Sequence, residues 1–257
     1  MIARTLALVL FVALAAGCAS GPALTDASRQ LRPHDALYRP DGAGPFPAVV
    51  VLHGCLGVRA KDTRWAESIR DAGYVSLVVD SMTGRGITTL QQRQSVCQGA
   101  ALWGGARAKD VAASLAYLRT LPFVDGSRLA VVGFSHGGWA AFDFLSTAQP
   151  EDVHGLRGLI AFYPYCGVAS KARWVGWQVN VPTLVLLAER DRMISTPRCR
   201  KIAEREAAGG RPVSVIVYPD LGHAFDWRQS PATDDARKQV AAFLATNLQV
   251  RHAGTTR

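Results

Sequence analysis

The chain has 257 residues and an apolar share of 49%, enough to build one large globular domain with a substantial core. Its formal charge of +9 is scattered without a basic block, which argues against a nucleic-acid-binding protein. Attraction to an anionic membrane surface is a simpler use of that charge. Neither C-x-x-C nor H-x-x-H spacing occurs, so we expect no metal, and nothing indicates an organic cofactor.

The N-terminus has the pattern of an export signal. A positive charge precedes residues 6–16, an apolar run that is too short to cross a bilayer as a helix. The run ends in LAAGC at residues 14–18, which resembles a bacterial lipobox, although Ala15 stands where leucine is usual. We therefore expect lipidation of Cys18, and the alanine that follows it favours an outer-membrane lipoprotein of the cell envelope that faces the periplasm. The alternative is a plain secretory signal cleaved nearby.

Four cysteines remain once Cys18 is set aside. They are Cys55, Cys97, Cys166 and Cys199. An even number in an oxidising compartment suggests two disulfides, and four cysteines allow three connectivities. Buried free thiols are the alternative.

Apolar runs alternate with helix-compatible stretches along the chain. Buried strands are expected over residues 48–52, 74–80, 129–132, 156–163, 181–188 and 213–218, with an edge strand within 33–39. Helices are expected over 65–72, 106–121, 139–145, 202–208 and 232–248. This alternation predicts an α/β fold with a mostly parallel central sheet and helices on both faces. Residues 81–104 form the longest irregular stretch, which is expected to be functional or mobile.

One pentapeptide stands between a predicted strand and a predicted helix. It reads GFSHG at residues 133–137 and matches G-x-S-x-G. In that context the pattern indicates a nucleophile elbow, in which a sharp turn holds the serine above the strand ends and small neighbours let strand and helix pass closely. Ser135 is therefore the candidate nucleophile.

A serine nucleophile needs a base and an acid that orients the base. In this fold class they follow in the order serine, acid, histidine. His223 lies in the loop after the strand at 213–218, and Asp191 lies after the strand at 181–188, with Glu189 as the alternative acid. We interpret Asp220 and Asp226, which flank His223, as turn residues.

Two backbone N–H groups should stabilise the oxyanion. One belongs to His136, the residue after the nucleophile. The other is expected in the loop HGCLG at residues 53–57, at the end of a buried strand, where Cys55 is the candidate donor.

Together these motifs resemble the dienelactone hydrolase family of α/β hydrolases, over residues 33–248. The resemblance implies an α/β-hydrolase fold without a large cap domain. Two departures matter: the founding enzymes use a cysteine where this chain has Ser135, and a glutamate where it has Gly54. The substrate should therefore not be fixed as a dienelactone, and a general serine esterase is the safer expectation.

The resemblance also guides the expected disulfide pairing. It favours the pairs Cys55–Cys97 and Cys166–Cys199.

Arg85, in the long irregular stretch, could meet a substrate carboxylate, with a solvated loop arginine as the alternative. Trp174 and Trp177 could line a pocket or simply pack. The segment that carries these tryptophans is too short for a large lid, which disfavours a long-chain lipase.

The sequence thus predicts a serine hydrolase that cleaves small carboxylic esters or lactones through an acyl-enzyme. The alternatives are a non-catalytic envelope binding protein on the same fold, or a peptidase or acyltransferase. Expected partners are a small ester and, through the lipid anchor, a membrane; the oligomeric state is not predicted. The expected organisation is a signal peptide at 1–17, an anchor and linker at 18–30, the hydrolase domain at 31–250 and a flexible tail at 251–257.

Overall fold

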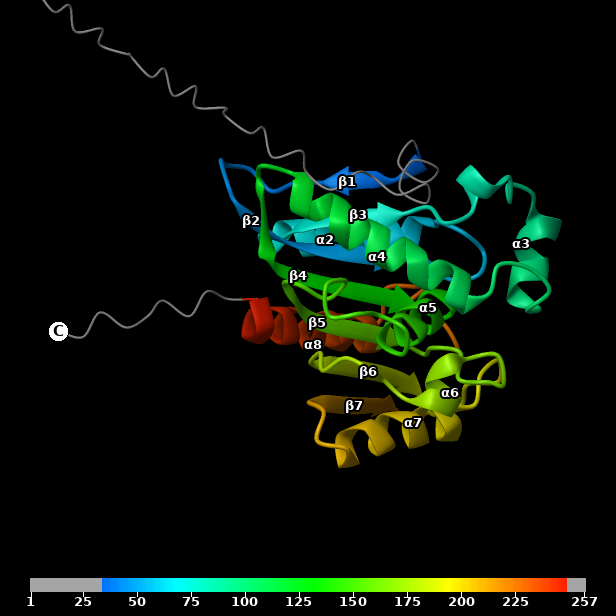
Figure 1. The fold of residues 1–257 in the computed structure, drawn as a ribbon. Helices are drawn as coiled ribbons and strands as arrows, with labels where there is room; N and C mark the ends of the chain where they lie inside the picture. Colours follow the sequence, from blue (N-terminus) through cyan, green and yellow to red (C-terminus); the bar gives the residue numbers. More distant parts are fainter. Residues whose placement is uncertain (1–33, 249–257) are drawn as a thin grey trace, which may run out of the picture.

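The computed structural model describes residues 34–248, and the expectations about the signal peptide and Cys18 lie outside this range. A seven-stranded sheet runs through the centre of the molecule (Figure 1). Its strands are β1 (Ala36–Tyr38), β2 (Phe46–Leu52), β3 (Val75–Val79), β4 (Val124–Phe134), β5 (Leu156–Phe162), β6 (Thr183–Ala188) and β7 (Val213–Tyr218). The helices are α2 (Ala60–Asp71), α3 (Leu90–Cys97), α4 (Gly104–Thr120), α5 (His136–Leu145), α6 (Lys171–Val175), α7 (Thr196–Ala208) and α8 (Pro231–Leu248), with a 3-10 turn at Thr83–Arg85.

The strand order is β1-β3-β2-β4-β5-β6-β7. Only β1 pairs antiparallel, with β3, and every other neighbouring pair is parallel. The central strands are buried on both faces, as their continuous apolar runs require. Because the strands are parallel, their carboxyl ends meet at one edge of the sheet, where α/β proteins build their sites.

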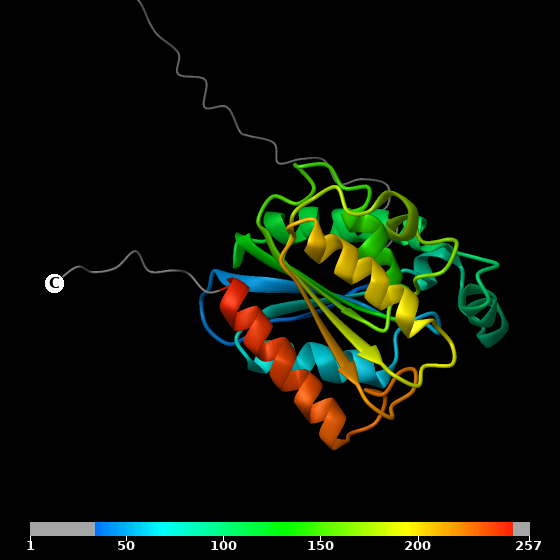
Figure 2. The same ribbon diagram turned by 90° about the horizontal axis from the view of Figure 1, so that it is seen from below.

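Helices cover both faces of the sheet, as predicted. Figure 2 shows α2 and α8 on one side and α4, α5 and α7 on the other. Two apolar cores result, one beneath α2 and α8 and one beneath α4, α5 and α7. The faces alternate along each strand: in β2, Val49 and Val51 belong to the first core, and Val50 and Leu52 to the second.

Some helices differ from the sequence-based expectation. Helix α2 begins at Ala60 and not near residue 65, because Arg59 is its N-cap and Asp62 accepts a hydrogen bond from the Arg59 N–H at 2.8 Å. Its first turn is polar, so the apolar pattern begins too late to reveal it. The stretch at 81–104, expected to be irregular, contains α3, whose Thr89 and Gln92 form a capping box. That T-x-x-Q signature was visible in the sequence.

Both predicted disulfides, Cys55–Cys97 and Cys166–Cys199, are formed. The free-thiol alternative is therefore wrong for these four residues. Within residues 34–248, no helix has the length and apolar character needed to span a membrane.

Candidate active site

Ser135 occupies a sharp turn between β4 and α5. Its backbone has φ 52° and ψ −109°, a conformation that costs energy for a residue with a side chain. The turn is possible because the residues two positions before and two positions after Ser135 are glycines. A Cβ at Gly133 would lie 2.5 Å from the Gly137 carbonyl oxygen, and one at Gly137 would lie 2.3 Å from the carbonyl oxygen of Leu52. The two glycines of the pentapeptide are thus required by close backbone packing.

Ser135, His223 and Asp191 form a continuous hydrogen-bonded chain. Ser135 Oγ lies 2.9 Å from His223 Nε2, and His223 Nδ1 lies 2.7 Å from Asp191 Oδ2. The other oxygen of Asp191 accepts hydrogen bonds from the N–H groups of Met193 and Ile194, at 2.8 and 2.9 Å. This fully buried carboxylate is therefore held rigidly beneath the imidazole.

The alternative acid, Glu189, points elsewhere. It is exposed, and its carboxylate accepts a hydrogen bond from the Asp220 N–H at 3.3 Å. Asp220 itself is an exposed turn residue with φ 60° that pairs with Arg190. Of the two candidate acids, only Asp191 contacts the histidine.

Cys55 and His136, whose N–H groups are the predicted oxyanion donors, line the hollow beside Ser135. The backbone of the Cys55 loop approaches the nucleophile closely, since a Cβ on Gly54 would lie 3.7 Å from Ser135 Cβ. His136 begins α5, so its N–H has no partner within the helix. Within the described residues, the N–H of Cys55 donates to no protein acceptor. Both N–H groups are thus free to receive an oxyanion.

Arg107, which the sequence analysis did not identify, forms hydrogen bonds beneath the site to the segments of His53 and His136. The side chain is fully buried, and its Nη1 donates to the His53 carbonyl oxygen and to His136 Nδ1, both at 3.0 Å. Burial lowers the pKa of Arg107 to about 10, so the guanidinium stays charged at neutral pH. One cation therefore contacts both segments that carry the candidate oxyanion donors.

His136 is neutral as a consequence. Burial and the neighbouring Arg107 cation lower its pKa to about 3, and the same causes lower the pKa of His53 well below its usual value. A neutral imidazole can accept the Arg107 hydrogen bond at Nδ1, which a protonated ring cannot.

The buried carboxylate of Asp226 holds Tyr163, whose ring packs against His223. Asp226 accepts hydrogen bonds from Tyr163 Oη, from Trp65 Nε1 at 2.9 Å and from Lys61 Nζ at 3.2 Å. The Tyr163 ring packs edge-on against His223, with 4.7 Å between ring centroids. Asp226 lies in a turn, as interpreted from the sequence, but its carboxylate bonds to distant side chains and not to the turn backbone. No local motif could have revealed its role, because its partners lie as many as 165 positions away.

Two hollows adjoin at Ser135. The lining of the larger, of about 340 Å³, includes Val96, Trp103, Trp139, Tyr165, Val168 and Ile194. The smaller, of about 130 Å³, is lined by residues that include Gly54, Leu56, Phe134, Tyr163 and Trp227. Five residues border both: Cys55, Cys97, Ser135, Met193 and His223. The nucleophile thus lies where a larger and a smaller compartment meet.

Two suggested substrate contacts lie elsewhere. The guanidinium of Arg85 is held by Asp110, at 2.6 and 3.0 Å, and by the Ser81 carbonyl oxygen, and Arg85 lines neither hollow. The suggestion that it meets a substrate is therefore wrong, because its charge is already neutralised. Trp174 is exposed and lines neither hollow, but its indole donates to the Val168 carbonyl oxygen at 2.9 Å. Trp177 is buried and packs against Phe142.

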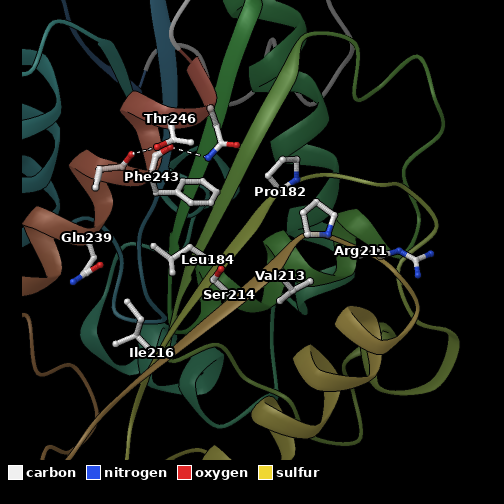
Figure 3. A pocket seen from close by; sticks show the side chains of 12 residues that line it. Pro182, Leu184, Arg211, Val213, Ser214, Ile216, Gln239, Phe243 and Thr246 are labelled. Carbon is white, nitrogen blue, oxygen red and sulfur yellow. Dashed lines mark hydrogen bonds between the residues drawn. The ribbon is translucent and has the colours of Figure 1, made fainter.

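A further hollow, of about 520 Å³, lies at the opposite end of β6 and β7, beside α8 (Figure 3). Its lining includes Pro182, Arg211, Ser214, Gln239 and Phe243, but no histidine, cysteine or carboxylate. Its serine, Ser214, therefore has neither the histidine base nor the carboxylate that a serine nucleophile requires. In the described part of the chain, no cluster of three or more histidine, cysteine or acidic side chains could hold a metal ion.

The fold and this site define an α/β hydrolase, and comparisons with known proteins agree. The family model of the dienelactone hydrolase family matches residues 35–250. A Bradyrhizobium protein named "Probable 2-oxo-3-(5-oxofuran-2-ylidene)propanoate lactonase" is 25% identical over 82% of this chain and 84% of its own. "Carboxymethylenebutenolidase 1" of Cupriavidus pinatubonensis is 30% identical over 51% of this chain and 52% of its own.

Solved structures share the fold. A thermophilic esterase from Thermogutta terrifontis, solved with propionate bound, superposes with a TM-score of 0.63 at 15% identity. The superposition covers 82% of this chain and 88% of the esterase. The chain therefore belongs to the dienelactone hydrolase family and is a carboxylic ester hydrolase of that family.

Proposed function

We propose that the protein hydrolyses small carboxylic esters or lactones through an acyl-enzyme on Ser135. The observation that carries this proposal is the unbroken contact from Ser135 Oγ to His223 Nε2 at 2.9 Å and from His223 Nδ1 to Asp191 Oδ2 at 2.7 Å. A serine hydroxyl is a weak nucleophile at neutral pH, and this arrangement supplies both the base and the group that orients it.

The chemistry follows from these positions. Ser135 Oγ attacks the ester carbonyl carbon while His223 Nε2 takes its proton, and Asp191 stabilises the imidazolium. The N–H groups of Cys55 and His136 receive the oxyanion, and such a donor is typically worth about 3 kcal/mol in the transition state. His223 then protonates the leaving alcohol, and a water molecule activated by the same histidine releases the acid.

The dimensions of the site favour small substrates. The two hollows hold about 340 and 130 Å³, which suits a compact acyl group and a compact alcohol. The relatives named a lactonase and a carboxymethylenebutenolidase support lactones as one substrate class, and the propionate-bound esterase supports short acyl chains as another.

We further propose that the enzyme works in the cell envelope, held to the membrane through lipidated Cys18. The lipobox-like sequence supports this, as do two disulfides, which persist in oxidising compartments. Mass spectrometry of the mature N-terminus tests it, with the Cys18→Ser variant as control. A diacylglyceryl adduct on Cys18 is the expected result, and an unmodified N-terminus would contradict it.

Kinetics with p-nitrophenyl esters of increasing acyl length test the function. We expect hydrolysis to be fastest with short acyl chains, and a burst of p-nitrophenol equal to the enzyme concentration if deacylation is slow. Ser135→Ala should lower kcat by about 10⁴-fold or more. Ser214→Ala, an exposed serine in the hollow of Figure 3, is the matched control and should leave kcat unchanged. Full activity in Ser135→Ala would refute the proposal.

A further inference from the structure

One disulfide lies directly in the catalytic centre. The Cys55–Cys97 bond joins the loop that carries a candidate oxyanion donor to the last residue of α3. Both cysteines border the large and the small hollow, so the bond lies where the two hollows meet beside Ser135.

Helix α3, which ends at Cys97, buries little of its surface against the rest of the protein. Of its eight residues only Val96 is buried, and Leu90 at its start is exposed. Its capping box is made within the segment itself, by Thr89 and Gln92, and so does not attach it to the body of the protein. In Figure 1, α3 projects at the outside of the molecule. A helix with so little buried apolar surface gains little packing energy against the sheet.

The Cys55 loop is anchored at its two ends, at His53 and at Arg59, whose N–H donates to Asp62 at 2.8 Å. His53 is fixed through its carbonyl oxygen by Arg107 and through its ring nitrogen Nε2, 3.2 Å from the Ser81 N–H. Beyond it, the backbone bond recorded within the loop runs from the Gly57 N–H to the Gly54 oxygen at 3.3 Å. The Arg93 guanidinium of α3 lies against Gly57. The disulfide and the contact of Arg93 with Gly57 therefore hold the middle of the loop, which contains Cys55.

We propose that Cys97 is a positioning and specificity-determining residue of the ester hydrolase. Through its bond to Cys55 it places the Cys55 N–H against the oxyanion and keeps the two substrate compartments separate. This inference rests on the proposed function of Ser135 and of the Cys55 N–H. Helix α3, which ends at Cys97, holds the disulfide in place from the outside of the molecule.

The proposal makes the activity dependent on redox state. A dithiol such as dithiothreitol transfers two electrons and two protons to the bond, which yields the thiols of Cys55 and Cys97 and the cyclic disulfide of the reagent. Cys55 and Cys97 are only half-buried and border the open site, whereas Cys166 and Cys199 are buried in the core. Mild reduction should therefore open the Cys55–Cys97 bond first.

The test compares the wild-type enzyme with Cys97→Ala and with the double variant Cys55→Ala/Cys97→Ala, which removes both thiols of this bond. We expect kcat for p-nitrophenyl acetate to fall by tenfold or more in both variants, with KM changed by less than threefold, because the loss falls on the oxyanion and not on substrate binding. The ratio of kcat/KM for the benzoate ester to that for the acetate ester should also change by threefold or more, since the two compartments are no longer kept separate.

The matched control is Cys166→Ala/Cys199→Ala. It removes the other disulfide, whose cysteines line neither hollow, and should leave kcat and the benzoate-to-acetate ratio at wild-type values. Folded Cys97→Ala enzyme with wild-type kcat and an unchanged ratio would overturn the proposal. If the variants do not fold, mild reduction of the wild type, with peptide mapping of the opened bond, gives the same readout. A wild type that hydrolyses no ester would instead refute the proposed function.

Discussion

Two neutral histidines, His53 and His136, lie buried on either side of Arg107 at the floor of the site. Their role is structural at neutral pH: His136 accepts a hydrogen bond at Nδ1, and the His53 ring contacts the backbone of Gly54 and Ser81. Each would have to bind a proton inside a dry site beside a fixed cation, which is unfavourable.

This burial predicts acid sensitivity. An unfolded histidine titrates near pH 6.5, whereas the pKa of His136 in the folded protein is about 3. Between these values the unfolded state binds a proton that the folded state does not, so the stabilisation present above pH 6.5 is lost as the pH falls toward 3. Urea unfolding at pH 6 and pH 5 should show the His136→Gln variant losing about 1 kcal/mol less than the wild type over that pH unit. An identical loss in both proteins would contradict the burial argument.

Arg107 should affect catalysis although it lines neither of the two hollows at Ser135. Arg107→Met keeps most of the side-chain volume but leaves the His53 carbonyl oxygen and His136 Nδ1 without their donor. We expect a loss of about 2–4 kcal/mol in the free energy of unfolding and a kcat reduced by tenfold or more, because both oxyanion segments lose their brace. Chemical denaturation and ester kinetics check this. Exposed Lys109→Met on the same helix is the control, and similar losses there would argue against a specific brace.

At the scale of the elements, the turn between β4 and α5 sets the geometry of the site. Gly137→Ala would place a methyl group 2.3 Å from the Leu52 carbonyl oxygen, so β2 and α5 would have to separate. We expect destabilisation of about 3 kcal/mol and loss of most activity, measured by thermal unfolding and ester hydrolysis.

The control for that change is Gly105→Ala, within α4. Its nearest neighbour would be the Lys171 side chain at 3.7 Å, an ordinary contact, and alanine favours a helix by about 1 kcal/mol over glycine. It should be neutral or stabilising. If both alanines had the same effect, close backbone packing at Gly137 would not be the cause.

The elements also show what can be predicted from sequence. Buried parallel strands such as β2 and β6 are continuous apolar runs, and the order of Ser135, Asp191 and His223 follows the strand ends, so these could be placed from pattern alone. The polar first turns of α2 and α7 could not, because their apolar spacing begins only after the helix has started. The contacts of Arg107 and Asp226 escaped prediction for a different reason: their partners come from distant segments that only the fold brings together.

At the scale of the whole molecule, the parallel sheet gathers loops from distant parts of the sequence at one edge. The Ser135 turn follows β4, the Asp191 loop follows β6 and the His223 loop follows β7, while the Cys55 loop follows β2. The Cys55–Cys97 disulfide then ties α3 to the Cys55 loop at that same edge, whereas Cys166–Cys199 joins buried parts of the core. The catalytic centre is thus assembled by the topology, and one covalent bond borders it.

The central claim, that Ser135 is an activated nucleophile, is tested most directly by labelling the folded, disulfide-intact protein with a fluorophosphonate probe. Intact mass and peptide mapping should show one adduct, on Ser135, that is absent from Ser135→Ala and strongly reduced in His223→Ala. A folded protein that takes up no probe, or takes it up equally well without Ser135, would contradict the account.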